Sequence, residues 1–131
     1  MNHRPIAIGM VLCEQVIVEE GTHNVTPVNC FNVREVEDLP GTATFFALAW
    51  LANGIGEMLA ELVVERLDNF EETFRVNRKL VFPDRLRDMR FSARLRSCPL
   101  PVAGHYQVSL VVDGEMIATR KFHVRRKGDE T

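Results

Sequence analysis

Residues 104–124 read GHYQVSLVVDGEMIATRKFHV and carry the clearest structural signal in the chain. Apolar residues alternate with polar ones in both halves of this segment, and Asp113-Gly114 lies between the halves. Alternation of this kind is typical of a half-buried strand. Asp-Gly favours a tight turn, because glycine adopts a positive φ without steric cost. The segment therefore predicts an antiparallel hairpin.

The register of this hairpin determines which side chains share a face. A strict two-residue turn would pair Tyr106 with Lys121. A three-residue loop, or a bulge at the turn glycine, would instead pair Tyr106 with Phe122 and Val112 with Met116. We expect the second register, because it gathers the apolar side chains on one face.

The same register sets His105 opposite His123 on the outward face of the hairpin. Closed metal sites usually use four ligands, and two imidazoles on an exposed face bind a divalent ion weakly. The other two histidines, His3 and His23, stand alone in the sequence. We therefore interpret the pair as incidental and expect neither a metal site nor a cofactor.

Most of the chain before the hairpin also predicts strands. Runs rich in β-branched and apolar residues are separated by clusters of turn residues, which is the pattern of an all-β protein. The expected strands are 6–18, 25–33, 44–52, 73–81 and 90–96.

The middle of the chain is ambiguous. In residues 57–67 (EMLAELVVERL) the apolar positions fit both a helical period and a period of two. Residue propensity favours a helix there. Residues 44–52 (TFFALAWLA) alternate bulky and small side chains, which suits a strand, although they too contain good helix formers.

Several motifs resemble an uncharacterised family of small bacterial immunoglobulin-like β-sandwich proteins. The resemblance rests on residues 7–22, on Gly54-Ile55-Gly56-Glu57, and on the closing segments 103–108, 113–115 and 120–124. It implies an antiparallel sandwich of about seven to eight strands, and a strand over 57–67. The family has no established activity, so no functional residue can be transferred from it.

Two aromatic residues fit that fold. Gly104-x-Tyr106-x-Val108 resembles the tyrosine corner, in which a tyrosine hydroxyl bonds to nearby backbone. Trp50 is the only tryptophan and lies on the third expected strand. Because such folds bury a tryptophan there, we expect Trp50 in the core.

Length and composition favour one soluble domain. The chain has 131 residues, a mass of 14.9 kDa and a net charge of −2. Through Phe74 it has three basic and twelve acidic residues, and after it thirteen basic and six acidic. We expect a single domain over 1–131, with an ordered core at 6–124 and a solvated tail at 125–131.

Cysteine usage and the N-terminal sequence suggest the compartment. The apolar run 6–13 is followed by Glu14 and lacks a cleavage site, so no secretory signal is expected. Cys13, Cys30 and Cys98 show no paired spacing, and we interpret them as reduced, buried small hydrophobic residues. The expectation is a cytoplasmic protein without disulfide bonds or a membrane span.

No catalytic motif is found in the sequence. There is no Gly-x-Ser-x-Gly elbow and no phosphate-binding loop, since Gly54-Ile55-Gly56 lacks the further glycine and the lysine. Adjacent acids such as Glu19 and Glu20 are normally solvated in turns. We therefore predict no catalytic, cofactor-binding or metal-binding residue, and a non-enzymatic interaction or accessory module that binds a protein partner or itself.

Residues 85–96 (RLRDMRFSARLR) favour a different partner. Arg90, Arg94 and Arg96 would share one strand face and could follow phosphate groups. The strand's own aromatic residue, Phe91, would point to the buried face, and a pI of about 6.1 is low for a nucleic-acid module. We therefore rank nucleic acid second, and expect the arginines to face acidic neighbours such as Glu61 and Glu65.

One enzyme class fits the chain length. A helix at 44–66 followed by curved strands would resemble a hotdog-type acyl-thioester enzyme. The segment Asn53-Gly54-Ile55-Gly56 interrupts that helix, and no histidine or acid lies at its start to activate a thioester. This reading stays an alternative, and we expect no small-molecule ligand.

Overall fold

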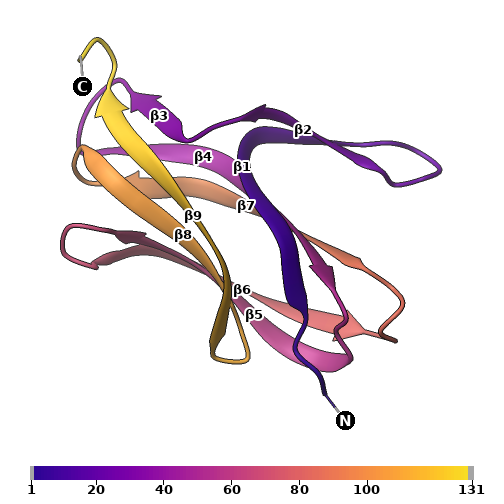
Figure 1. Cartoon of the computed structure of the whole chain (residues 1–131). Coiled ribbons are helices and arrows are strands. Elements are labelled where there is room, and N and C mark those ends of the chain that lie inside the picture. Colours follow the sequence, from indigo (N-terminus) through magenta and orange to yellow (C-terminus); the bar gives the residue numbers. More distant parts are fainter. Residues whose placement is uncertain (1, 130–131) are drawn as a thin grey trace.

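A computed structural model describes residues 2–129, and it is all-β (Figure 1). The strands are β1 (Ile6–Val18), β2 (Val25–Cys30), β3 (Val33–Val36), β4 (Gly41–Ala52), β5 (Gly56–Arg66), β6 (Glu72–Phe82), β7 (Met89–Leu100), β8 (Gly104–Val112) and β9 (Glu115–Arg126). They form a four-stranded sheet of order β2-β1-β4-β7 and a five-stranded sheet of order β3-β9-β8-β5-β6. The described residues contain no helix that could cross a membrane.

The ambiguous segment 57–67 is a strand. β5 lies between β6 and β8, and one of its faces is buried against the other sheet. Met58, Ala60, Leu62 and Val64 are at most 3% exposed, so the period of two describes the burial. Tertiary packing overrides the helical propensity of these residues. The helix on which the hotdog alternative depended does not form, since β4 and β5 occupy its residues.

The chain has one strand more than expected within the described residues. Residues 25–33 were expected to form one strand, but β2 ends at Cys30 and β3 begins at Val33 in the other sheet. Asn29 has a φ of 53°, which interrupts the extended backbone just before this crossing. β3 then pairs with β9 in parallel, with Val33 beside His123. Nine strands in two sheets result.

The β8–β9 hairpin follows the expected register over most of its length. Tyr106 pairs with Phe122 and Leu110 with Ala118, as predicted. Nearer the turn the register shifts, so Val112 pairs with Glu115 rather than with Met116. The turn itself has two residues of positive φ, Asp113 (47°) and Gly114 (83°), which suits the twist of a tight hairpin. The extra residue is therefore accommodated at Ile117, and the expected bulge at the glycine was wrong.

Aromatic rings fill the space between the sheets. Phe45 on β4 contacts Phe122 on β9 edge to face, with ring centroids 5.6 Å apart. Phe31, between β2 and β3, contacts both rings at 5.4 and 6.1 Å. Tyr106 stacks on Phe122, with ring centroids 5.6 Å apart. Both sheets thus contribute aromatic rings to the core.

The expectation that Trp50 lies in this core was wrong. The face of β4 that points inward carries Ala47 and Ala49, both fully buried, whereas Phe46, Leu48 and Trp50 lie on the outer face. The inward face also carries Phe45 and Leu51, so it combines bulky and small residues. Trp50 faces away from the second sheet and is half-buried there.

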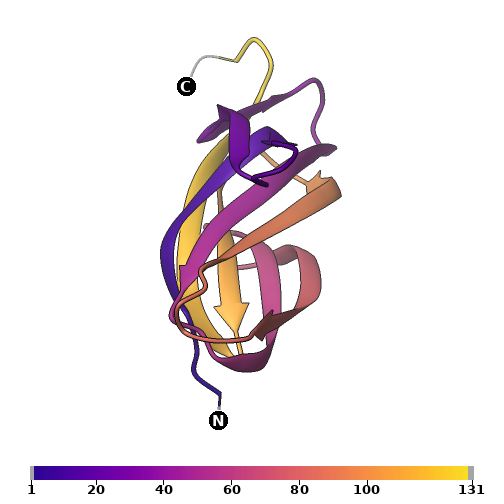
Figure 2. The same cartoon turned by 90° about the vertical axis from the view of Figure 1, so that its right-hand side faces the viewer.

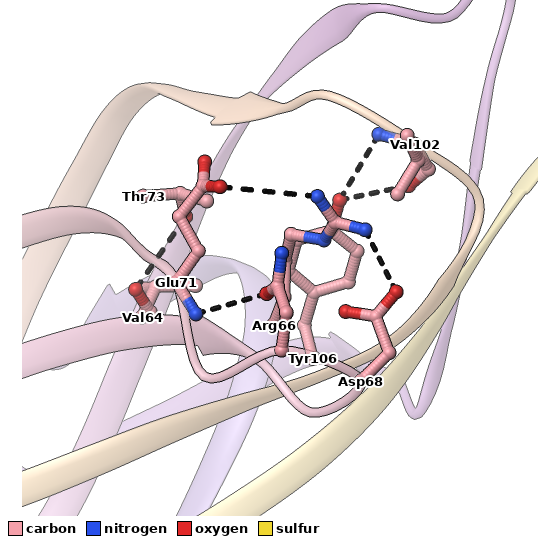
Figure 3. A network of polar contacts seen from close by, with 8 residues as sticks. Val64, Arg66, Asp68, Glu71, Thr73, Val102 and Tyr106 are labelled. Atoms are coloured by element: carbon pink, nitrogen blue, oxygen red, sulfur yellow. Dashed lines mark hydrogen bonds and ion pairs between the residues drawn. The ribbon is translucent and has the colours of Figure 1, made fainter.

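Tyr106 forms the expected corner (Figure 3). It is fully buried, and its hydroxyl donates to the Val102 carbonyl at 2.7 Å. The same oxygen accepts a hydrogen bond from the Val102 N–H at 3.3 Å. Arg66, the partner of Tyr106 across the β5–β8 ladder, pairs with Asp68 at 2.7 Å and with Glu71 at 4.0 Å. The tyrosine thus fixes the loop before β8, and the two ion pairs fix the turn between β5 and β6.

Two peripheral segments of the chain, the tip of the β1–β2 hairpin and the end of β9, are each fixed by a hydrogen bond. The hairpin projects from the body of the two sheets, as Figures 1 and 2 show. At its tip the His23 carbonyl accepts a hydrogen bond from Arg90 Nη1 at 2.6 Å. At the opposite end of the chain, β9 extends to Arg126, and the Lys127 N–H donates to the Val36 carbonyl at 2.8 Å. Residues 130 and 131 of the expected tail lie outside the described residues.

Candidate binding face

The outer surface of β4 and β7 carries aligned aromatic and basic side chains. The antiparallel register sets Trp50 opposite Arg90 and Phe46 opposite Arg94. Directly opposed residues of an antiparallel pair point to the same face. We call this surface the arginine face, and define it by Phe46, Trp50, Arg90, Arg94 and Arg96.

Alternation along β7 produces the basic half of the arginine face. Phe91, Ala93 and Leu95 are at most 3% exposed and belong to the core between the sheets. The arginines that alternate with them are exposed. β7 is also an edge strand, paired only with β4, so its outer side is open to solvent. The predicted common face of the three arginines is confirmed.

The expectation that these arginines face Glu61 and Glu65 was wrong. Glu61 and Glu65 lie on β5, which belongs to the other sheet, and Glu61 forms an ion pair with Arg75. Within residues 2–129, none of the three arginines of the face has a carboxylate at ion-pair distance. Their charge is therefore not neutralised by the fold.

The aromatic half of the face was missed from the sequence. Only Phe91, on the same strand as the arginines, had been considered, and it is buried. The neighbouring strand β4 supplies Phe46 and Trp50 instead, and both are half-buried. Between them Leu48 has no exposed surface. The signal was the alternation in 44–52, but its use required knowing that β4 pairs with β7.

The two histidines of the closing hairpin do meet. His105 and His123 are direct partners, and their rings stack with centroids 4.7 Å apart and planes 28° from parallel. In the part of the chain that the structure describes, no group of three or more histidine, cysteine or acidic side chains converges on one point. The pair by itself offers a divalent ion at most two nitrogen ligands.

The three cysteines differ in their surroundings. Cys13 and Cys98 are fully buried as expected, but the expectation was wrong for Cys30, which is exposed. Burial raises the pKa of the Cys98 thiol to about 11. Burial also raises the pKa of Cys13, and the nearby Cys30 adds to that rise.

A surface hollow of about 740 Å³ lies between the N-terminal segment and the β8–β9 turn. Its titratable groups are engaged in structural contacts. Arg4 pairs with Glu115 at 2.8 Å, and a carboxylate oxygen of Asp113 accepts the Leu59 N–H at 2.9 Å. His3 Nδ1 lies 3.0 Å from the Asn53 carbonyl oxygen. These contacts fix the N-terminal segment and the β8–β9 turn on either side of the hollow.

Comparisons with known proteins assign no family to this chain. No model of a known protein family matches it, and no curated protein is similar in sequence. Among solved structures, part of the alkylpurine DNA glycosylase AlkC from Pseudomonas fluorescens, solved bound to DNA with an abasic site analogue, is similar with a TM-score of 0.48. The two chains are 12% identical, and the match covers 72% of this chain and 27% of the glycosylase.

Proposed function

We propose that the chain is a non-enzymatic binding module that contacts an acidic segment of a protein partner through the arginine face. One observation carries the proposal. Within residues 2–129, arginines without carboxylate partners lie beside half-buried aromatic rings, with Arg90 opposite Trp50 and Arg94 opposite Phe46.

The composition of the face suits protein recognition. Tryptophan and arginine are enriched among the residues that dominate binding energy at protein interfaces. A guanidinium binds a carboxylate with two parallel hydrogen bonds, which gives both strength and orientation. Side chains four residues apart on a strand are separated by roughly 13 Å, so Arg90 and Arg94 could each hold one acid of an extended partner.

Single-stranded nucleic acid is the second candidate. Bases stack on aromatic rings while arginines neutralise phosphates, and both groups occur on this face. We rank it second because half-buried rings offer less surface for stacking.

We also propose that the two sheets form an immunoglobulin-like sandwich. Support comes from the hydrogen bonds between Tyr106 and Val102, which have the pattern of a tyrosine corner. A determination of the strand connections by experiment, compared with the order given above, would test this class.

A binding experiment tests the arginine face. Fluorescence anisotropy would follow a labelled glutamate-rich peptide and a labelled mixed-sequence single-stranded oligonucleotide. We expect wild type to bind the peptide more tightly, and the Arg90→Ser/Arg94→Ser variant to lose at least about tenfold in affinity, as removal of two charge-assisted pairs predicts. The matched control is Arg85→Ser/Arg87→Ser, which removes the same charge from the exposed loop before β7.

The outcomes separate the candidates. An equal loss in both double variants would mean a net-charge effect and contradict the proposal, as would the absence of peptide binding by wild type. Tighter binding of the oligonucleotide, lost with the face variant alone, would favour the second candidate. Since Arg90 also holds the His23 carbonyl, Arg94→Ser alone checks that the loss does not come from the hairpin.

A further inference from the structure

Cys13 on β1 and Cys30 on β2 are direct partners across the β1–β2 ladder. The Phe31 N–H donates to the Leu12 carbonyl at 2.9 Å, so the contact between the two chain segments continues past the cysteines. Directly opposed side chains of an antiparallel pair point to the same face, with Cβ atoms about 4.5–5.5 Å apart.

This position suits a disulfide bond. Cα atoms of directly opposed residues in an antiparallel ladder lie about 4.5–5.5 Å apart, which is inside the range of about 4.4–6.8 Å found for bridged cysteines. Both thiols lie on the outer face of the four-stranded sheet, because Cys13 is also the direct partner of the outward Phe46. Cys98 belongs instead to the core between the sheets. The sheet itself thus separates Cys98 from the other two thiols.

We propose that Cys13 and Cys30 form a redox modification site, in which a low-molecular-weight disulfide converts the two thiols into a cross-strand disulfide bond. The proposal is independent of the arginine face as a binding surface. It rests on the pairing of the two residues, on their common face and on the exposure of one of them.

The exchange proceeds in two balanced steps. The Cys30 thiolate attacks one sulfur of the reagent, forms a mixed disulfide and releases the first reagent thiolate. The Cys13 thiolate then attacks Cys30 Sγ, and the second reagent thiolate leaves. The two protein thiols lose two protons and two electrons, and the reagent disulfide is reduced to two thiols.

Exposure sets the order of the two steps. Cys30 is exposed and accepts the reagent, whereas Cys13 has no exposed surface. Burial and the neighbouring Cys30 raise the pKa of Cys13, which makes it a poor first nucleophile. Once Cys30 carries the reagent, its sulfur lies beside Cys13, and the second attack is intramolecular.

The disulfide bond would link the two strands of the projecting hairpin covalently. It would close a loop through residues 14–29, whose tip contacts Arg90 through the His23 carbonyl. Cys30 is exposed, and exposed disulfides are among the more easily reduced ones. We therefore expect a dithiol reductant to reduce the Cys13–Cys30 disulfide bond back to two thiols.

The test treats the folded full-length chain with oxidised glutathione and counts free thiols after denaturation. We expect the count to fall from the three of the sequence to one, without a retained glutathione, and peptide mapping to find Cys13 linked to Cys30. Two matched variants serve as controls. Cys98→Ser should form the Cys13–Cys30 link as wild type does, and Cys30→Ser should keep both of its remaining thiols free. Circular dichroism of each variant checks that it is folded.

Three results would overturn the proposal. They are a glutathione adduct on Cys30 that persists while Cys13 stays free, a Cys30–Cys30 link between two molecules, and unchanged thiols in the folded protein. Persistence of the Cys13–Cys30 link in the Arg90→Ser/Arg94→Ser variant is expected, since the two sites are separate.

Discussion

Tyr106 bonds through its hydroxyl to the backbone of Val102 in both directions, donating to the carbonyl at 2.7 Å and accepting from the N–H at 3.3 Å. The ring stacks on Phe122, its direct partner across the β8–β9 hairpin. One side chain therefore fixes the loop before β8 and contributes to the core between the sheets.

Removal of that hydroxyl should cost stability with little change in packing. Tyr106→Phe keeps the ring but leaves two backbone groups of Val102 without their partner. We expect the free energy of unfolding to fall by about 1–2 kcal/mol, measured by urea denaturation. A loss below about 0.3 kcal/mol would show that water replaces the hydroxyl at no cost. Phe122→Leu, which leaves the hydroxyl in place, serves as a comparison for packing alone.

Stability should decrease in alkaline solution because of Cys98. Burial raises its pKa to about 11 from an ordinary value of 9.0, although a hydrogen bond from Thr73 opposes the rise. The unfolded thiol ionises first, so the contribution of the buried neutral thiol is complete below pH 9 and is lost as pH rises toward 11. A shift of this size corresponds to about 2–3 kcal/mol.

Cys98→Ala isolates this effect. Its free energy of unfolding should decline less steeply between pH 9 and 11 than that of wild type, whatever the difference at neutral pH. Some decline should persist, because burial also raises the pKa of Tyr106 and of Cys13. Parallel curves for the two proteins would contradict the assignment to Cys98.

The parts of the fold that depend on local pattern were predictable. The β8–β9 hairpin follows from alternation and a turn dipeptide, and its register was correct wherever apolar side chains had to share a face. The turn geometry favoured two residues over three, so the bulge moved to Ile117. Apolar patterning pointed to the wrong partner there, because buried Val112 pairs with the exposed Glu115 rather than with an apolar residue.

The parts that depend on long-range pairing were not predictable. Alternation in 44–52 separated a bulky face from a small one, but which of them points inward depends on the side chains of the opposite sheet. For the same reason, the aromatic half of the arginine face was missed. Trp50 and Arg90 are forty residues apart in sequence, and only the pairing of β4 with β7 brings them together. The hydrophobic pattern of residues 25–36 likewise does not show that the chain crosses to the other sheet between β2 and β3.

Leu48 provides a test of the outer face of β4. It has no exposed surface although it points away from the second sheet, whereas Leu59 on β5 is 48% exposed. Leu48→Ala should lower the free energy of unfolding by about 2–4 kcal/mol, and Leu59→Ala by less than about 1 kcal/mol. Chemical denaturation of both variants compares the same change of side chain. Similar small losses would mean that the outer face is loosely packed.

Glycine 54 should not tolerate a methyl group. A Cβ on Gly54 would lie 2.7, 2.8 and 2.9 Å from three ring carbons of Phe82, whose side chain is only 2% exposed and has no room to move. We expect Gly54→Ala to cost about 1–3 kcal/mol through overpacking. The matched control is Gly9→Ala, since nothing lies within 4 Å of its added Cβ.

A double-mutant cycle distinguishes this clash from a loss of backbone freedom. If the Phe82 ring causes the cost, then Gly54→Ala should cost less in a Phe82→Ala background than in wild type, because alanine lacks the Cγ and the two Cδ atoms that the added Cβ would meet. The expected coupling is at least about 0.5 kcal/mol, as for residues in direct contact. An unchanged cost would mean that the backbone conformation at residue 54, rather than the neighbouring ring, requires glycine.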